Sequence, residues 1–433
     1  MNYLPNILFA IALIIGIGYF TKNVKKLIRN IKLGHDIDVS DNKSQRWKNM
    51  AMIALGQSKM VRRPVAGFLH IIVYVGFVII NIEVLEIIID GILGTHRVFS
   101  SIGPLYGFLI GSFEILALLV FVAVIVFWIR RNILKLQRFW KSEMTSWPKN
   151  DANYILYFEM VLMSLFLIMN ATDIHFQAMN SGNIISQYIA PLFEGFSVSS
   201  LHIIERTAWW IHILGILVFL NYLYFSKHLH ILLAFPNTFY ASLKPKGQFD
   251  NLAAVTKEVK MMMDPNVNPF AAPAEGAEMP AKFGASDVQD LNWVQLLNAY
   301  TCTECGRCTS ECPANQTGKK LSPRKIMMDT RDRLEEVGKN LDVNKGTFVD
   351  DGKQLLDNYI TREELWACTS CNACVEACPV SINPLSIILD MRRYLVMEQS
   401  AAPVELNNMM TNIENNGAPW PYNQMDRLNW KNE

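Results

Sequence analysis

The sequence predicts an all-α protein in two parts, a bundle of five membrane-spanning helices followed by a helical domain organised by cysteines. Two observations predict this fold class. The long apolar runs lie before Phe235, whereas all eight cysteines lie after Tyr300. The apolar fraction of 51% is therefore an average over two different halves. The net charge is +1 and no part is strongly basic, so we expect no nucleic-acid partner.

Five stretches are long and apolar enough to cross a bilayer, which takes about 20 residues. Each should be a helix, because a helix satisfies its own backbone hydrogen bonds in lipid. The first stretch lacks the basic start and the small-residue cleavage site of a secretory signal, so we expect it to be retained. The stretches are residues 3–21, 66–89, 104–129, 154–173 and 207–226.

The charges of the connecting loops predict the orientation in the membrane. The loops after the first and third stretches are rich in Lys and Arg, whereas the other two loops hold only Arg97 and Arg206. By the positive-inside rule, the N-terminus then lies outside, and everything after the fifth stretch is cytoplasmic.

Composition divides the chain further. Six prolines interrupt residues 236–290, where no apolar period is sustained, and we interpret this segment as a linker. Ser322 and Pro323 then form a helix start between two groups of cysteines. We expect a membrane anchor at 1–235, a linker at 236–290, a helical cysteine domain at 291–398 and a polar tail at 399–433 that docks a partner.

The eight cysteines form two runs of identical spacing, each followed by a proline. In each run three cysteines are separated by two residues, and the fourth follows after three. This is the bacterial ferredoxin run, in which three thiolates bind one [4Fe-4S] cluster and the fourth binds the other cluster. We assign one cluster to Cys302, Cys305, Cys308 and Cys378, and the other to Cys368, Cys371, Cys374 and Cys312.

Two other interpretations of the cysteines fit less well. Structural zinc sites use paired cysteines and would leave the third and fourth cysteine of each run unexplained. Disulfides are typical of small secreted proteins rather than of tight clusters on a long segment. We therefore predict an α-helical ferredoxin-like domain with two [4Fe-4S] clusters. The sequence shows no nucleophile motif, nucleotide-binding glycine loop or flavin fingerprint, so substrate chemistry should belong to a partner.

Histidines in or near the membrane stretches predict a haem, since an ionisable residue inside a bilayer is a functional hypothesis by default. His70 lies about one turn into the second stretch. It follows Arg62 and Arg63, which we expect to pair with haem propionates. His212 and His230 are 18 residues apart, about five turns, and share a helix face if the fifth helix continues that far.

We expect His70 and His230 to be the axial ligands of a b-type haem near the cytoplasmic surface. His228 is the alternative to His230. The opposing interpretation is that His228 and His230 are interfacial side chains beside Lys227, as is common at the ends of membrane helices.

A second haem nearer the outer face is a further possibility. His212 would be one ligand, but the second helix offers Ile80 and Asn81 where the other ligand would be expected. His175 or His202 could substitute from the outer side. Against this stands the use of intramembrane histidines as hydrogen-bonding residues between helices.

Three acidic residues also lie in the membrane stretches, Glu83, Glu86 and Glu114. Acidic groups are costly in lipid and could serve a proton path or a quinone pocket. The alternative is that each makes a satisfied contact between helices.

The histidine pattern resembles two known families. Five helices with an outer N-terminus, together with His70, His212 and His230, resemble the cytochrome b gamma subunit of respiratory nitrate reductase. The second histidine of that family's second helix is missing here, which leaves the outer haem in doubt. The stretch from Trp209 to Asn237 looks more like the membrane subunits of heterodisulfide-reductase-type complexes.

The cysteine half is similar to the small iron–sulfur subunit of those reductases. Residues 297–308 and 321–326 resemble in particular the bacterial membrane-bound iron–sulfur oxidoreductases that link electron-transfer flavoproteins and related donors to menaquinone. Some members of that group continue into domains with paired Cys-Cys motifs, which this sequence lacks. The resemblance implies that such a module would be a separate subunit.

Together these resemblances imply a respiratory electron-transfer subunit of the bacterial cytoplasmic membrane. It would connect a cytoplasmic redox partner, such as a cysteine-rich iron–sulfur or flavoprotein subunit, with a menaquinone-type quinone. The same parts serve either direction of electron flow. Two rival hypotheses are a haem-free anchor that tethers a ferredoxin domain and a redox sensor that signals through the C-terminal tail.

Overall fold

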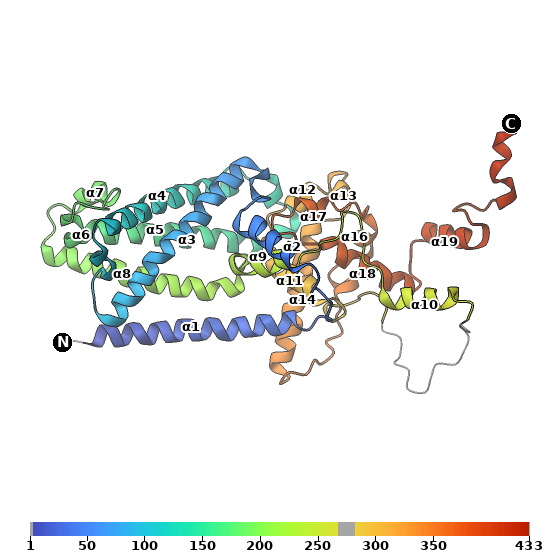
Figure 1. Ribbon diagram of the computed structural model, residues 1–433, viewed down its shortest axis with the longest axis horizontal. Helices are drawn as coiled ribbons and strands as arrows, with labels where there is room; N and C mark the ends of the chain where they lie inside the picture. Colours follow the sequence, from blue (N-terminus) through green and yellow to red (C-terminus); the bar gives the residue numbers. More distant parts are fainter. Residues whose placement is uncertain (1–2, 267–281, 433) are drawn as a thin grey trace.

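The computed structural model describes residues 3–266 and 282–432. Five long helices lie side by side, and the cysteine-containing half caps one end of them, opposite the N-terminus (Figure 1). The long helices are α1 (Leu4–Ile31), α3 (Pro64–Leu93), α4 (Pro104–Asn132), α5 (Trp147–Thr172) and α8 (Val198–Tyr222).

Each long helix has the length and apolar composition needed to cross a membrane, with α8 extended by the 3₁₀ turn η7 (Leu223–Phe225). The prediction of five membrane helices is therefore confirmed. The first four have a proline in the first turn, where a missing N–H breaks no helical hydrogen bond. α8 is capped instead by Ser197, whose hydroxyl accepts a hydrogen bond from the N–H of Ser200 at 3.2 Å.

The fifth membrane helix differs from its prediction at both ends. It begins at Val198 rather than at residue 207, because Glu205 and Arg206 interrupt the apolar pattern but pair with each other in the structure. The regular α-helix stops at Tyr222, and a new helix begins only at His230. The condition under which His212 and His230 would share a helix face, one continuous helix, is therefore not met, and helix phase does not position them.

Small residues let the long helices approach closely. A Cβ atom placed on Gly91 of α3 would lie 2.6 Å from ring carbons of Phe9 on α1, so the aromatic ring fills the space that a side chain would need. Phe113 and Phe166 are fully buried in the same core. This use of glycine is typical of helix contacts in membranes.

Short helices connect the long ones. Those at the outer end are η3 (Val98–Ile102), α6 (Ile174–Ala178), α7 (Ser186–Ile189) and η6 (Ala190–Phe193). Those at the cysteine end are α2 (Lys43–Met50), the π-helix η1 (Ala51–Leu55), η2 (Met60–Arg62), η4 (Gln137–Phe139), η5 (Ser142–Met144), η8 (Lys227–Leu229), α9 (His230–Phe239) and α10 (Ala253–Met263).

The cysteine-containing half is a set of short helices around the longer α14 (Pro323–Val343) and α18 (Pro384–Met397). Leu334 and Ile387, one from each, are fully buried in its core. No β-strand occurs in residues 3–266 or 282–432, so the all-α prediction is confirmed. The other helices are η9 (Val288–Asp290), α11 (Trp293–Thr301), α12 (Arg307–Ser310), α13 (Pro313–Gln316), α15 (Leu355–Asn358), α16 (Arg362–Ala367) and α17 (Ala373–Ala377).

Two segments flank this half. Residues 282–290, which we expected to belong to the linker, pack into its core through Ala285 and Val288. The rest of the expected linker includes residues outside the described ranges. At the other side, the tail forms α19 (Val404–Asn416) and η10 (Gln424–Lys431), which extend away from the body of the molecule (Figure 1).

Polar contacts fasten the cysteine-containing half to the bundle. The amide of Asn30 at the end of α1 donates to the Tyr300 hydroxyl at 2.9 Å. Asn237 of α9 donates to the carbonyl of Val380 at 2.7 Å. These contacts come from different parts of the chain, so the two halves meet in a defined orientation.

Candidate functional site

The two cysteine runs adopt the same local structure. Each begins where a helix ends, at Cys302 after α11 and at Cys368 after α16. Each then turns through a residue with positive φ, Gly306 at 71° and Asn372 at 60°, which glycine and asparagine adopt most readily. A short helix follows and carries the third cysteine. The turns therefore direct three thiols of each run to one side.

The thiols of the two runs lie close to one another. One cavity is lined by the first three cysteines of the first run and by Cys378 of the second, with Cys374 also at its wall. Cys312 of the first run interacts electrostatically with Cys368 and Cys374 of the second. All eight cysteines lie in the described residues, and none of them forms a disulfide. The arrangement suits two clusters with exchanged fourth ligands.

Burial of these thiols favours their protonated form when no metal is bound. Burial raises the pKa of Cys302 to about 12 and that of Cys378 to about 11. At neutral pH both sulfurs are then protonated, unless a metal ion takes the place of the proton. Iron binding is the chemistry that four such thiols around one cavity can perform.

The two cysteine sets differ in exposure. Each set contains two buried cysteines, Cys302 and Cys378 in the first and Cys312 and Cys374 in the second, and Cys371 of the second set is the one that is exposed. Arg307, which lies inside the first run, donates to the backbone carbonyls of Lys59 and Met60 at 3.3 Å, just before α3. The first set therefore faces the membrane helices, and the second set is nearer the surface.

A buried carboxylate joins the first cysteine run to the segment after α8. The side chain of Glu304 is 2% exposed and forms ion pairs with Lys227 and, at 2.8 Å, with Arg331. Burial alone would raise the pKa of Glu304, but these two cations hold it below its usual range. Lys227 is also within 3.7 Å of Asp151, so two acids and two bases form one balanced cluster.

His70 and His230, the expected haem ligands, lie next to each other. Their ring centroids are 6.4 Å apart. Two imidazoles that each bind a metal at about 2 Å from opposite sides would have centroids about 6 Å apart. The buried Nδ1 of His70 has no hydrogen-bond partner among the residues that the structure describes. The distance suits two imidazoles that hold one metal ion between them.

A backbone contact orients His230. Its Nδ1 lies 3.1 Å from the carbonyl oxygen of Lys227, and because a carbonyl only accepts, Nδ1 is the protonated donor. Nε2 then remains free to bind a metal, as in many ligating histidines. Burial lowers the pKa of both His230 and its neighbour His228, to about 3 for His228, so both imidazoles are neutral.

His228 fits a packing role better than a ligand role. Its ring packs against Phe219 at 5.4 Å and is nearly perpendicular to the ring of His230 at 5.5 Å. Arg62 and Arg63 also differ from expectation, because they contact the cysteine-containing half. Their partners are Glu376 at 2.5 Å for Arg62, and Glu311 at 2.9 Å and Ser310 at 2.6 Å for Arg63.

His212 is buried without a second histidine beside it. It is 2% exposed and packs against Phe166, and its Nδ1 has no partner within the described ranges. Ile80 of α3 is buried in the neighbouring core. Of the two candidate outer ligands, His175 packs against His96 and His202 is exposed. The structure thus places His70 beside His230, but it places neither His175 nor His202 beside His212.

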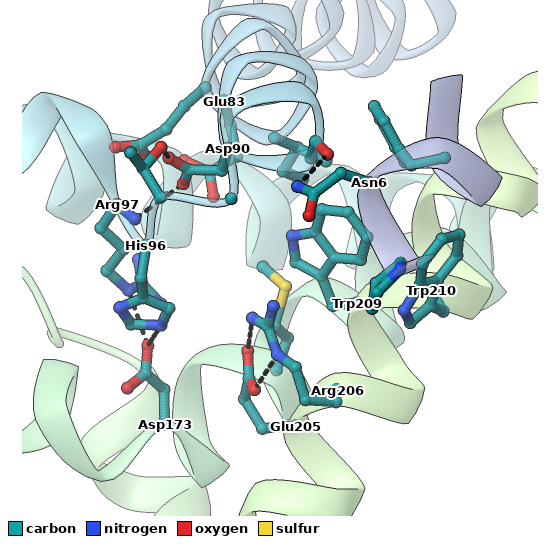
Figure 2. Close-up of a pocket in the computed structure, with 18 residues that line it drawn as sticks. Asn6, Glu83, Asp90, His96, Arg97, Asp173, Glu205, Arg206, Trp209 and Trp210 are labelled. Carbon is teal, nitrogen blue, oxygen red and sulfur yellow. Dashed lines mark hydrogen bonds and ion pairs between the residues drawn. The ribbon is translucent and has the colours of Figure 1, made fainter. Parts of the chain in front are cut away.

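A cavity of about 400 Å³ lies at the outer end of the bundle (Figure 2). Phe9, Trp209 and Trp210 form an aromatic wall, and the rest of the lining mixes charged side chains with small and uncharged residues. His96, Asp173 and Glu205 come close enough to hold a metal ion. However, Arg97 and Arg206 already pair with Asp173 and Glu205 (Figure 2), so their charges oppose a bound cation.

The structure separates the three intramembrane acids. Glu114 accepts hydrogen bonds from Asn170 at 3.0 Å and from two backbone N–H groups at the start of α7. Glu86 accepts from Tyr106 at 3.1 Å and from the N–H of residue 99. Glu83 lines the outer cavity, and its Oε2 has no partner in the part of the chain that is described. The hydropathy pattern does not distinguish these three acidic residues, and only their contacts in the structure do.

Comparisons with known proteins support the iron–sulfur assignment. Residues 301–382 match the family described as a 4Fe-4S dicluster domain. The predicted helical domain with two [4Fe-4S] clusters is therefore confirmed. No solved structure matches the chain.

Three curated relatives are by name an iron–sulfur-binding oxidoreductase, a quinone oxidoreductase and a ferredoxin. The probable iron-sulfur-binding oxidoreductase FadF of Bacillus subtilis is 29% identical over 99% of this chain and 61% of its own length. The EtfAB:quinone oxidoreductase of Syntrophomonas wolfei is 25% identical over 92% and 55%. A probable membrane-anchored ferredoxin of Chromohalobacter salexigens is 33% identical over 35% and 24%. The chain thus spans little more than half the length of the first two relatives.

Proposed function

We propose that this chain passes electrons between a cytoplasmic redox partner and the membrane quinone pool, with two [4Fe-4S] clusters and a b-type haem as carriers. The observation that carries the proposal is the position of the His70–His230 pair beside the first cysteine set. The side chain of Lys227 pairs with Glu304, which lies in the first cysteine run. The backbone carbonyl of Lys227 orients His230. One short segment therefore holds both sites in place.

The proposed cluster ligands are the two crossed sets of cysteines. Because the set containing Cys371 is nearer the surface, it is the one that exchanges electrons with the soluble partner. The set containing Cys302 faces the bundle. A relative whose name couples an electron-transfer flavoprotein to quinone supports a flavoprotein as the partner, either directly or through a separate cysteine-rich subunit.

His70 and His230 are the proposed axial ligands, and the fused haem-binding anchor is part of this proposal. The neutral imidazoles and the free Nε2 of His230 support it. His228 remains the alternative ligand. Arg62 and Arg63 serve as docking contacts to the two-cluster domain rather than as partners of propionates.

The outer cavity is the described site that best suits a quinone headgroup. It combines an aromatic wall with hydrogen-bonding groups and with the unpartnered carboxyl oxygen of Glu83. Glu83 follows His70 by 13 residues on α3, a rise of about 20 Å. The second haem that the sequence leaves open would use His212, which lies one turn inward of Trp209 on α8.

We also propose the division and orientation expected above. The anchor is 1–235, the linker 236–290, the two-cluster domain 291–398 and the tail 399–433, in the bacterial cytoplasmic membrane with the N-terminus outside. The basic loops at the cysteine end of the bundle support this orientation.

Anaerobic kinetics test the proposed function. The purified full chain in detergent is reduced with dithionite, excess reductant is removed, and a short-chain menaquinone analogue is added. Rapid reoxidation of haem and clusters is the expected result. Reoxidation no faster than that of a His70→Ala variant with intact clusters would favour the haem-free anchor.

A further inference from the structure

A second cavity, of about 450 Å³, opens where α3 and α4 meet the two-cluster domain. Its wall contains four arginines from three segments of the chain. Ser310 of the two-cluster domain closes one side. The lining residues are Arg62, Arg63, Pro64, Val65, Ala66, Arg130, Leu136, Gln137, Arg138 and Ser310.

Two of the four arginines have no acidic partner. Arg62 and Arg63 pair with glutamates of the two-cluster domain, whereas no ion pair of Arg130 or Arg138 occurs in residues 3–266 and 282–432. The buried Nε of Arg138 also has no hydrogen-bond partner there. Arg63, Arg130 and Arg307 add like charge around Arg138, and the opposing charge comes from Cys305, a proposed cluster ligand. Among the described residues, the cavity therefore combines two arginines that no carboxylate pairs with and one unused donor.

Apolar side chains adjoin these arginines. Val65 at the start of α3 is 56% exposed, and Ile133 and Leu134, just after the end of α4, are each 61% exposed. In the proposed orientation these residues lie at the level of the lipid headgroups of the cytoplasmic leaflet. A surface that combines arginine side chains with exposed apolar side chains suits a ligand that has an anionic headgroup and an apolar tail.

We propose that this cavity binds the phosphate of an anionic phospholipid, with Arg130 and Arg138 as the phosphate ligands. Guanidinium groups bind phosphate through paired hydrogen bonds, and basic pockets at the cytoplasmic ends of membrane helices attract anionic headgroups. The acyl chains contact Val65, Ile133 and Leu134. Since Ser310 shares the cavity, the lipid helps to hold the two-cluster domain on the bundle. This inference does not depend on the proposed electron transfer.

Native mass spectrometry of the full chain tests the proposal. Delipidated protein in detergent is titrated with phosphatidylglycerol and with phosphatidylcholine of the same acyl chains. The expected result is retention of phosphatidylglycerol at concentrations where phosphatidylcholine is lost. The double variant Arg130→Gln/Arg138→Gln should weaken phosphatidylglycerol binding by about tenfold or more. Equal binding of the two lipids by the unmodified chain would overturn the proposal without any variant.

A matched control separates this cavity from general surface charge. The variant Lys135→Gln/Lys141→Gln removes two positive charges from the same loop, outside the cavity, and should retain the lipid. An equal loss in this control would show that the binding is not local. Haem content is measured on the same samples. Loss of haem with the lipid retained in the arginine variant would assign the two arginines to haem propionates and refute the lipid site.

Discussion

Glu304 lies between two cysteines of one run and still carries a buried charge. A carboxylate in this position would repel the anionic cluster, unless other groups compensated it. Lys227 and Arg331 provide that compensation. Asp151, next to Lys227, brings the cluster to two acidic and two basic side chains. Buried pairs contribute little net stability, but removal of one partner is costly. Their role here is to fix the first cysteine run against the segment that holds His230.

The variant Lys227→Met should therefore destabilise the docked state by about 3 kcal/mol, because it leaves Glu304 with one partner fewer. Chemical unfolding followed by cluster absorbance measures the loss. The double variant Lys227→Met/Glu304→Gln should recover part of the stability but not all of it, since Glu304 no longer carries a charge while Asp151 still lacks Lys227. A single variant as stable as the unmodified chain would show that the pair does not secure the domain.

Glu83 and Glu114 should respond differently to substitution. Glu83→Gln removes an ionisable group that has a free oxygen, so folding should be retained while quinone-dependent reoxidation slows. Glu114→Leu leaves three hydrogen-bond donors without an acceptor and should lower stability by about 3 kcal/mol or more. Thermal unfolding and quinone kinetics on both variants distinguish the two roles. Unchanged quinone kinetics in Glu83→Gln would remove the outer cavity as the quinone site.

At the scale of single elements, close contact between α1 and α3 depends on Gly91. An added methyl group would meet the rigid ring of Phe9 at 2.6 Å. Gly18 of α1 serves as the control for Gly91, because a Cβ atom on Gly18 would have no neighbour within 4 Å. The two glycines occupy membrane helices of similar length, yet only one of them is needed for packing.

Gly91→Ala should cost about 1–3 kcal/mol, as overpacked contacts do, whereas Gly18→Ala should be neutral or slightly stabilising. Thermal unfolding of both variants in detergent, monitored by circular dichroism, provides the comparison. Equal melting temperatures would show that α1 can shift away from α3 without cost.

Element boundaries also show which parts of the fold the sequence could predict. The five spans and the cysteine sets were predictable, because hydropathy and thiol spacing are local signals. The early start of α8 was not, since Glu205 and Arg206 break the apolar pattern while they pair inside the structure. The break at Ser226 coincides with the predicted end of the fifth stretch, and there the hydroxyl of Ser226 accepts from the N–H of His228 and starts a new element.

At the scale of the whole molecule, the two halves meet through contacts that no local pattern reveals. Lys227 and Glu304 are 77 residues apart, and Arg62 and Glu376 are 314 apart. These contacts place the first cysteine set at the end of the bundle where His70 and His230 meet. The cysteine half extends from that end of the bundle, away from the N-terminus (Figure 1), and Cys371 of its second set is exposed. The order of sites along the molecule is that of a carrier between solution and membrane.

The central claim is that both cofactor types reside in this chain. The most direct test is the dithionite-reduced minus oxidised visible spectrum of the purified full chain, with haem and total iron determined on the same sample. We expect a b-type haem signal together with enough non-haem iron for two four-iron clusters, and loss of the haem signal in His70→Ala with the iron–sulfur content retained. Iron and sulfide without haem would contradict the account and leave a tethered ferredoxin.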